Sequence, residues 1–199
     1  MLLTTREFLK IITKSLPISD PIYEFGSFLV PGQEKEANLR PFFPKKKYYG
    51  CDMREGNGVD LVLNLHNIDL PSNIAGSVLS FDTLEHVEYP RKAVEEMHRI
   101  LRPGGIIVIS SVMNFPIHEY PYDYWRFTPQ GLSSLLSIFD KSIVTCTGED
   151  NFPISILGVA FKGAVPDLKK FEVKLNKWRE KNLKIHRYLV KNNIKIDKI

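Results

Sequence analysis

Apolar and polar positions alternate along the chain in blocks that predict strands separated by helices. Five apolar runs, most of them bounded by turn-forming residues, have the length and composition of strands. They lie at 22–25, 48–51, 59–65, 76–81 and 106–109, and two closing strands are expected at 142–146 and 154–161. The run Ile106–Ile109 is wholly β-branched, which is typical of a strand buried on both faces of a parallel sheet.

Apolar residues at helical spacing predict the connecting helices. Thr4 and Glu7 have the form of a capping box at the start of a helix over 4–16. Further helices are expected at 33–43, from Pro90 to the Pro103-Gly104-Gly105 turn, and from Thr128 to 139. Strands that alternate with helices and end in a hairpin indicate an α/β fold, with a mostly parallel sheet and helices on both faces.

Length and composition agree with a single soluble core. The chain has 199 residues, of which 43% are hydrophobic, and it contains no apolar run long enough to cross a bilayer. Arg6, Glu7 and Lys10 interrupt the segment where a secretory signal would be apolar, so a cytoplasmic location is expected. Cys51 and Cys146 match neither a redox pair nor a zinc motif, and we expect two free, buried thiols.

The net charge of +4 is unevenly distributed along the chain. Residues 169–199 hold eleven Lys or Arg against three Asp or Glu, a net +8, so residues 1–168 carry a net −4. We therefore expect one domain over 1–168 and a basic helical extension over 169–199. The extension is expected to cover the edge of the domain; contact with an anionic membrane surface, nucleic acid or a partner subunit, including a homodimer, is the less favoured alternative.

Polar clusters follow four of the predicted strands, at 24–33, 52–54, 66–69 and 82–86. The carboxyl ends of parallel strands share one edge of a sheet, and ligands bind at that edge. Gly26 and the amides of its turn are suited to an anionic group, although an ordinary turn is the alternative. Asp52, at the end of the second strand, is placed to bind the two hydroxyls of a ribose.

Three further stretches carry a resemblance to a known family. Asp82-Thr83-Leu84-Glu85-His86-Val87, the helix end Arg99-Ile100-Leu101-Arg102-Pro103-Gly104-Gly105, and the following Ile106-Ile107-Val108-Ile109-Ser110 resemble class I S-adenosylmethionine-dependent methyltransferases of the methyltransferase-11 type. The resemblance extends over about residues 20–162. It implies a Rossmann-like, seven-stranded, mostly parallel sheet with an antiparallel last strand, and S-adenosylmethionine as the cofactor.

The resemblance also implies the cofactor-binding residues. The first acidic-glycine motif falls on Glu24, Gly26 and Ser27 beside the methionine portion, the ribose acid on Asp52, and the adenine contacts on Met53, Leu65, His66 and Asn67, with Phe81 and Asp82 near the sulfonium. Three departures leave open a binding module without catalysis. The loop lacks the second glycine that relatives have two residues after the first, the helix between the second and third strands is missing, and His66 stands where relatives carry an acid.

The stretch NFPIHEYPYDYWRFT, residues 114–128, is the candidate wall of the acceptor site. His118 is the candidate general base, because an imidazole titrates near neutrality. Aromatic and charged residues supply contacts to an acceptor: Tyr122, Asp123, Tyr124, Trp125 and Arg126. The alternative is that the aromatic residues only roof the sheet and that Arg126 pairs with Asp123. The stretch resembles a subgroup linked with modification of glycans and other small molecules.

These observations predict transfer of a methyl group to an oxygen or nitrogen atom of a small molecule, such as a saccharide. The alternative is a degenerate methyltransferase fold that acts through its basic helix. A nicotinamide dehydrogenase is disfavoured because the full GxGxxG motif is missing, and nucleic-acid methylation because residues 1–168 are acidic. His86 is a candidate contact at the cofactor rim. The five histidines show neither HxxxH nor HxH spacing, so no metal site is expected.

Overall fold

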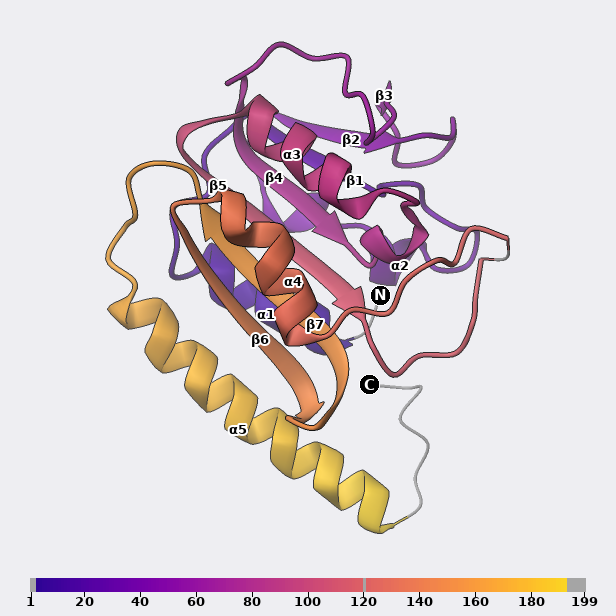
Figure 1. Cartoon of the computed structure of the whole chain (residues 1–199), viewed down its shortest axis with the longest axis vertical. Coiled ribbons are helices and arrows are strands. Elements are labelled where there is room, and N and C mark those ends of the chain that lie inside the picture. The colour runs from indigo at the N-terminus through magenta and orange to yellow at the C-terminus, as the bar shows by residue number, and fades with distance from the viewer. Residues whose placement is uncertain (1–2, 120, 193–199) are drawn as a thin grey trace.

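The strands pair in the order β3-β2-β1-β4-β5-β7-β6 and form one seven-stranded sheet (Figure 1). The computed structural model describes residues 3–119 and 121–192. The strands are β1 (Ile22–Phe25), β2 (Tyr48–Asp52), β3 (Leu61–Val62), β4 (Ala75–Phe81), β5 (Leu101–Val112), β6 (Lys141–Glu149) and β7 (Phe152–Phe161). β7 pairs antiparallel with β5 and with β6, whereas the other pairings are parallel. The predicted fold class is confirmed.

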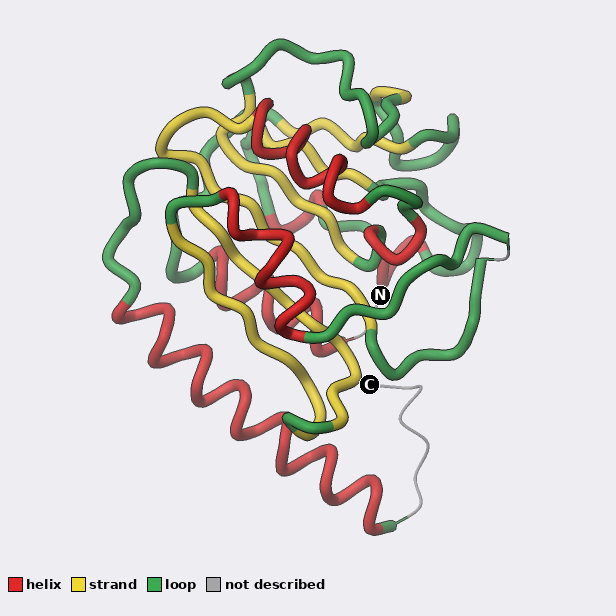
Figure 2. Tube along the Cα trace, in the orientation of Figure 1, coloured by secondary structure: helices red, strands yellow, loops and turns green. Residues whose placement is uncertain are grey.

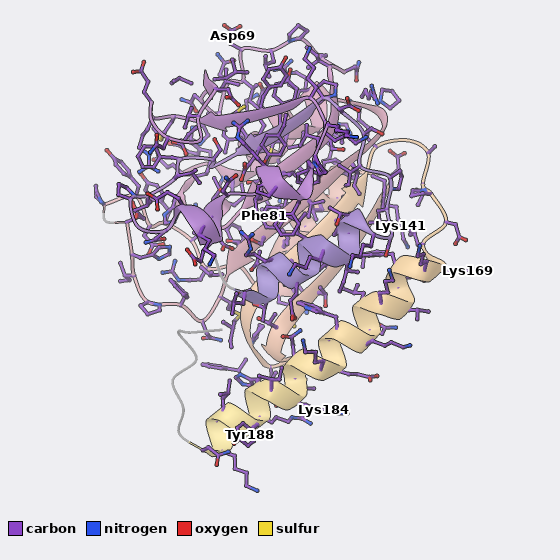
Figure 3. All side chains as sticks on the ribbon, turned by 180° about the vertical axis from the view of Figure 1, so that it is seen from behind. Asp69, Phe81, Lys141, Lys169, Lys184 and Tyr188 are labelled. Atoms are coloured by element: carbon purple, nitrogen blue, oxygen red, sulfur yellow. The ribbon has the colours of Figure 1, made fainter. Side chains whose placement is uncertain are left out.

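Helices cover both faces of the sheet. α3 (Pro90–Ile100) and α4 (Pro129–Leu135) lie over one face, and α1 (Leu3–Thr13) and α5 (Lys169–Lys191) lie over the other (Figures 1 and 3). Each pair of helices buries its apolar stripe in a separate cluster of core residues. The central strands therefore have apolar neighbours on both sides, and all seven residues of β4 are buried.

Several predicted elements have different bounds. The expected strand over 59–65 is reduced to the two residues of β3, and β5 begins at Leu101, so the Pro103-Gly104-Gly105 turn lies inside it. The helix expected over 33–43 splits into α2 (Glu34–Ala37) and η1 (Arg40–Phe42). The physical reason is local: the Asn38 side chain accepts the Arg40 N–H at 3.0 Å, and Pro41 has no N–H to continue the helix.

The start of α1 differs from the predicted capping box. The helix already includes Leu3, and Thr4 lies in its buried face rather than at its cap. Within the described residues, Thr4 Oγ1 has no hydrogen-bond partner. Glu7, the other half of the expected box, instead pairs with Lys181 of α5 at 2.9 Å. The apolar spacing that predicted this helix is confirmed, because Phe8, Leu9 and Ile12 are buried.

The first half of α5 is part of the core. Phe171 and Trp178 are buried and lie against Phe8 of α1, with ring centroids 6.4 and 5.7 Å apart. The second half exposes Tyr188 and Val190 and is attached by an ion pair between Arg187 and Glu149 at 2.7 Å. The helix thus covers one edge of the domain beside α1 (Figure 3). Residues 193–199 of the expected extension lie outside the described residues.

The two thiols and the character of the helices complete the description of the fold. Cys51 and Cys146 are both free and buried, as expected. Among the helices of residues 3–119 and 121–192, none combines the length and the apolar character needed to span a membrane.

Candidate functional site

The register of the central strands brings the four predicted polar clusters to one edge of the sheet. Phe25 of β1 pairs with Cys51 of β2 on one side and with Ser80 of β4 on the other. The turn that follows β1 therefore lies between the ends of β2 and β4. The long loop from β5 to α4 leaves the sheet at this same carboxyl edge (Figure 2). The edge has two halves, one over β1 to β3 and one over β4 and β5.

Asp52 ends β2 and is the central side chain of the first half. Its carboxylate is largely buried and accepts the Arg54 backbone N–H at 3.0 Å, the Arg54 Nε–H at 3.2 Å and the Phe28 N–H at 3.4 Å. The Arg54 guanidinium lies 4.5 Å from the centre of the Phe28 ring and 3.9 Å from Glu119 in the β5–α4 loop. Arg54 therefore covers Asp52 and reaches across to the other half of the edge.

The turn after β1 is tightly packed, which changes the interpretation of Gly26. Its φ is +85°, and a Cβ built on it would lie 2.1 Å from Thr83 Oγ1. The amides of Gly26 and Ser27 both donate to the Cys51 carbonyl, at 2.9 and 3.2 Å. The missing side chain makes room for Thr83, not for a ligand, and these two amides are not free for the predicted anionic group.

The β2–β3 connection contains no helix, in agreement with the departure found in the sequence. The loop instead folds back on the turn after β1, where the Leu29 N–H donates to the Asn57 carbonyl at 2.8 Å. Gly58 has a φ of +87°, and a Cβ there would lie 2.4 Å from the Ser27 carbonyl oxygen. The two loops can approach this closely only because Gly58 has no side chain.

Glu24 is buried beneath this turn. It accepts a hydrogen bond from the Tyr48 hydroxyl of β2. Burial raises the pKa of Glu24 to about 7, against the opposing effect of the Tyr48 hydrogen bond. Ser27 is buried as well, and its Oγ has no hydrogen-bond partner within the described residues. Both side chains are therefore buried below the surface of the edge.

The other predicted cofactor contacts are unequally placed. Met53 is 70% exposed and is free to cover a planar ring, whereas Phe81 is buried in the core cluster of α1 and does not face the edge. Leu65 packs against the opposite cluster. His66 Nε2 accepts the Tyr89 N–H at 3.1 Å, and Asn67 is exposed beside them. The structure thus supports Met53, His66 and Asn67 as accessible positions and removes Phe81.

The second half of the edge is built on the segment after β4. Asp82 has a φ of +48°, and its carboxylate accepts the Ser110 hydroxyl at 2.6 Å. Glu85, in the short helix η2 (Leu84–His86), is fully buried and accepts the Ser111 hydroxyl at 2.6 Å. Burial, together with the negative charge of Asp82, raises the pKa of Glu85 to about 8.

The loop at 114–126 is held by Arg126. Its five N–H groups donate to the Phe115, Pro116 and Trp125 carbonyls and to both oxygens of Asp123. The Arg126 hydrogen bonds hold the pKa of Asp123 well below its usual range. The pairing of Arg126 with Asp123, which the sequence left as an alternative, is therefore what the structure shows. Neither side chain is free to contact an acceptor in this conformation.

The same loop docks on η2. The Tyr124 and Trp125 amides donate to the Glu85 carbonyl at 2.8 and 3.2 Å, and Trp125 Nε1 donates to the Val87 carbonyl at 3.0 Å. The rings of Tyr122, Tyr124 and Trp125 stay 59%, 43% and 44% exposed, respectively. Their aromatic faces remain accessible to an acceptor.

The docked loop brings its His118 against His86 of η2. Their ring centroids are 4.7 Å apart, and one ligand atom from each histidine and from Glu85 lie within 4.8 Å of one another. Burial lowers the pKa of His86. The sequence did not reveal this group, because Glu85 and His118 are far apart in the chain and only the docked loop brings them together. The LEHV motif, which carried the family resemblance, was the available signal.

The residues of the edge fit only part of the cofactor that the resemblance implies. The Asp52 carboxylate, which Arg54 covers, lies beside the exposed Met53 and fits the nucleoside half of S-adenosylmethionine. The packed Gly26 turn offers no open backbone cradle to the methionine half, which leaves that half to the region beside Asp82. The departures seen in the sequence therefore affect one end of the cofactor site and spare the other.

Comparisons with known proteins agree with this fold. A family model described as a methyltransferase domain matches residues 42–109, from η1 to β5. Among curated proteins, none matches the sequence. A Thermotoga maritima protein described as a SAM-dependent methyltransferase, possible histamine N-methyltransferase, is 17% identical, with a TM-score of 0.60 over 80% of this chain and 92% of that one.

Two further solved structures show the range of this fold. Phosphoethanolamine N-methyltransferase 2 of Haemonchus contortus, in complex with phosphomonomethylethanolamine and S-adenosylhomocysteine, is 16% identical, with a TM-score of 0.51 over 71% of this chain and 38% of that one. The cyclase SpnF is 13% identical, with a TM-score of 0.58 over 80% and 82%. The solved structures agree with the expected fold, and the family model matches the expected methyltransferase domain over residues 42–109.

Proposed function

We propose that this chain, which carries a methyltransferase domain and fold, transfers a methyl group from S-adenosylmethionine to an oxygen or nitrogen atom of a small molecule such as a saccharide. The observation that carries the proposal is the convergence at one sheet edge of Asp52, on the first half, with Asp82 and His118, on the second. The two halves correspond to a cofactor side and an acceptor side. The acidic character of residues 1–168 argues against a polyanionic acceptor.

When bound, S-adenosylmethionine supplies a methyl group on a sulfonium, and a nucleophile attacks it in line. We assign the ribose hydroxyls to the Asp52 carboxylate and the adenine face to Met53, with His66 and Asn67 at the adenine edge. In this arrangement Asp82 lies toward the methionine half. The protein's main contribution is then to orient the acceptor atom, since proximity supplies much of the acceleration of a displacement reaction.

His118 is the proposed base for a hydroxyl or amine acceptor. Its Nδ1 lies 3.1 Å from the Pro116 carbonyl oxygen, which only accepts, so Nδ1 carries the proton. This hydrogen bond leaves the Nε2 lone pair to take a proton from the acceptor. Asp123, which Arg126 holds in place, lies 3.3 Å from the same Nδ1 and stabilises the imidazolium that forms.

The exposed rings of Tyr122, Tyr124 and Trp125 are the proposed acceptor contacts. Aromatic faces of this kind bind the apolar face of a sugar ring or a planar substrate. Arg126 and Asp123 act in this proposal through the loop they hold, because their polar atoms are already paired with one another. Their predicted direct contact with an acceptor is therefore replaced by a positioning role.

The alternative is a binding module that has lost catalysis, and one observation favours it. Arg54 pairs with Asp52, and Thr83 fills the space at Gly26, so part of the usual cofactor cradle is closed. In that case the basic helix α5 would be the acting surface. However, its first half is used to cover α1, and its ion pairs with Glu7 and Glu149 occupy two of its basic side chains.

Calorimetric titration with S-adenosylmethionine and S-adenosylhomocysteine tests the proposal. We expect one site per chain, and binding in Asp52→Ala weakened by ~30-fold or more, because a charge-assisted pair to the ribose is lost. Asp167→Ala is the matched control: Asp167 is an exposed carboxylate between β7 and α5, outside this edge, and its removal should leave the affinity unchanged. No binding to the wild-type protein at millimolar ligand would favour the binding module instead.

A further inference from the structure

We propose that Glu85, His86 and His118 form a binding site for one divalent transition-metal cation. One carboxylate oxygen of Glu85 and one ring nitrogen from each histidine lie within 4.8 Å of one another. Two imidazoles and one carboxylate are a donor set that suits Zn²⁺, Co²⁺ and Fe²⁺, and three protein ligands leave positions open for water or a substrate.

The hydrogen bonds of the two imidazoles indicate which ring nitrogen each histidine would offer to a metal. His86 Nδ1 lies 2.7 Å from the Tyr122 carbonyl oxygen, and His118 Nδ1 lies 3.1 Å from that of Pro116. A carbonyl oxygen cannot donate, so both rings carry their proton on Nδ1 and keep a lone pair on Nε2. Histidine ligands in metal sites are oriented in the same way, by an N–H bond from the second ring nitrogen to a carbonyl or carboxylate.

Glu85 provides an independent observation that points to a ligand. Its side chain is fully buried, and Ser111 donates to Oε2, but Oε1 has no hydrogen-bond partner within the described residues. A buried carboxyl oxygen without a partner is costly. A bound cation would complete the environment of the carboxylate.

The charges around the group also favour a cation. Asp82 and Arg126 act on Glu85, while Asp123 and Glu119 act on His86. Arg126 is neutralised by its bidentate pairing with Asp123, which leaves the carboxylates of Asp82 and Glu119. Arg54, the other nearby cation, is 3.9 Å from Glu119 and also pairs with Asp52. The surroundings of the two imidazoles are therefore acidic on balance.

The group needs a small adjustment to bind an ion. Ligand atoms about 2.1 Å from one ion lie no more than about 4.2 Å apart, which is slightly less than the observed limit of 4.8 Å. Glu85 and His86 belong to η2, whereas His118 belongs to the 114–126 loop. The adjustment therefore falls between the loop and η2 and need not move the sheet.

An ion here would lie on the acceptor side of the edge. Its open positions would bind an acceptor hydroxyl and lower the pKa of that hydroxyl, so that the loss of a proton no longer depends on a free His118. This use rests on the proposed methyl transfer, whereas binding of the ion does not. Turnover that persists unchanged after removal of metal with a chelator would leave His118 as the free base.

Calorimetry with Zn²⁺, after treatment with a chelator and in the absence of S-adenosylmethionine, tests the site directly. We expect one ion per chain, with affinity lowered by ~30-fold or more in His118→Ala and in Glu85→Gln. Co²⁺ gives a second readout, because ligation by nitrogen produces visible absorption bands that the two variants should lose. His98→Ala, which removes a histidine packed on Phe139 outside the group, is the matched control and should bind as the wild type does.

Two results would overturn the site. The first is the absence of Zn²⁺ binding at large molar excess, and the second is equal affinity in the wild type, His118→Ala and Glu85→Gln. If Glu85→Gln fails to fold, His86→Ala takes its place, with circular dichroism as the check on folding. The outcome is separate from that of the cofactor titration, because each ligand is measured without the other.

Discussion

The two halves of the sheet edge are held together by different means. Over β1 to β3 the loops pack closely at two glycines. Gly26 leaves room for the Thr83 side chain, and Gly58 leaves room for the Ser27 carbonyl oxygen. Over β4 and β5 the 114–126 loop is tied to η2 by side chains, chiefly by the pairing of Arg126 with Asp123. The first half depends on the absence of side chains and the second on buried charge. Substitutions should therefore damage them in different ways.

The largest effect is expected from breaking the charged pair. Asp123→Ala leaves the Arg126 guanidinium and the His118 amide without the acceptor that binds both. Loss of one partner of a largely buried ion pair costs about 4 kcal/mol, so the loop should detach from η2. Limited proteolysis should then cleave within 114–126 while the core stays resistant. Asp167→Ala is the control, and a loop in Asp123→Ala that resists cleavage as the wild type does would contradict the account.

A smaller effect is expected where the loops meet at a glycine. Gly58→Ala places a methyl group 2.4 Å from the Ser27 carbonyl oxygen, at a φ of +87°. Gly32 has nearly the same φ, +85°, but no atom within 4 Å of the position of a Cβ. Urea unfolding should show a loss of about 3 kcal/mol for Gly58→Ala, from overpacking and backbone strain together. Gly32→Ala should lose about 1 kcal/mol, from strain alone. Equal losses would mean that the close contact is unimportant.

The buried carboxyl of Glu85, on the acceptor half, should make the stability of the protein depend on pH. The pKa of Glu85 is about 8 in the folded protein, against an ordinary value of 4.5, so between these pH values the folded state holds a proton that the unfolded state releases. Its contribution is therefore fully present below about pH 4.5 and is lost as the pH rises toward 8. In the presence of a chelator, Glu85→Gln should raise the Tm by about 5 °C at pH 9 and leave it unchanged at pH 4. A difference in Tm that does not vary with pH would contradict the assignment.

The smallest effect is expected at the side chain that joins the two halves. In the proposed site Arg54 competes with the cofactor for Asp52, so Arg54→Ala should raise the affinity for S-adenosylhomocysteine ~3-fold, as expected for release of one partly exposed ion pair. Arg102→Ala is the control, because it also removes one arginine charge but lies at the start of β5, at the opposite end of the strand from the site. Unchanged affinity in Arg54→Ala would mean that this arginine moves aside at no cost.

The sequence predicted the parts of this edge that depend on local chemistry. The β-branched run at Ile106–Ile109 and the proline at Pro90 placed a strand and a helix correctly, and the polar residues after the strands located the edge. Gly26 was misinterpreted because glycine indicates a close approach without saying what approaches. Phe81 was misplaced because its position at a strand end does not reveal which face it occupies.

The group on the acceptor side could not be predicted from spacing. His118 meets Glu85 and His86 only because Arg126 folds the 114–126 loop back on η2, and that contact is tertiary. The alternative pairing of Arg126 with Asp123 was visible in the sequence because the two opposite charges lie three residues apart. Its consequence for His118 was not visible.

The most direct test of the central claim is a crystal structure with S-adenosylhomocysteine bound. The account predicts the ribose hydroxyls within hydrogen-bond distance of the Asp52 carboxylate, the adenine against Met53, and the Arg54 side chain displaced from Asp52. The homocysteine sulfur should then face the exposed rings of the 114–126 loop. A nucleoside bound away from Asp52, or crystals that exclude the ligand while Arg54 remains paired, would contradict it.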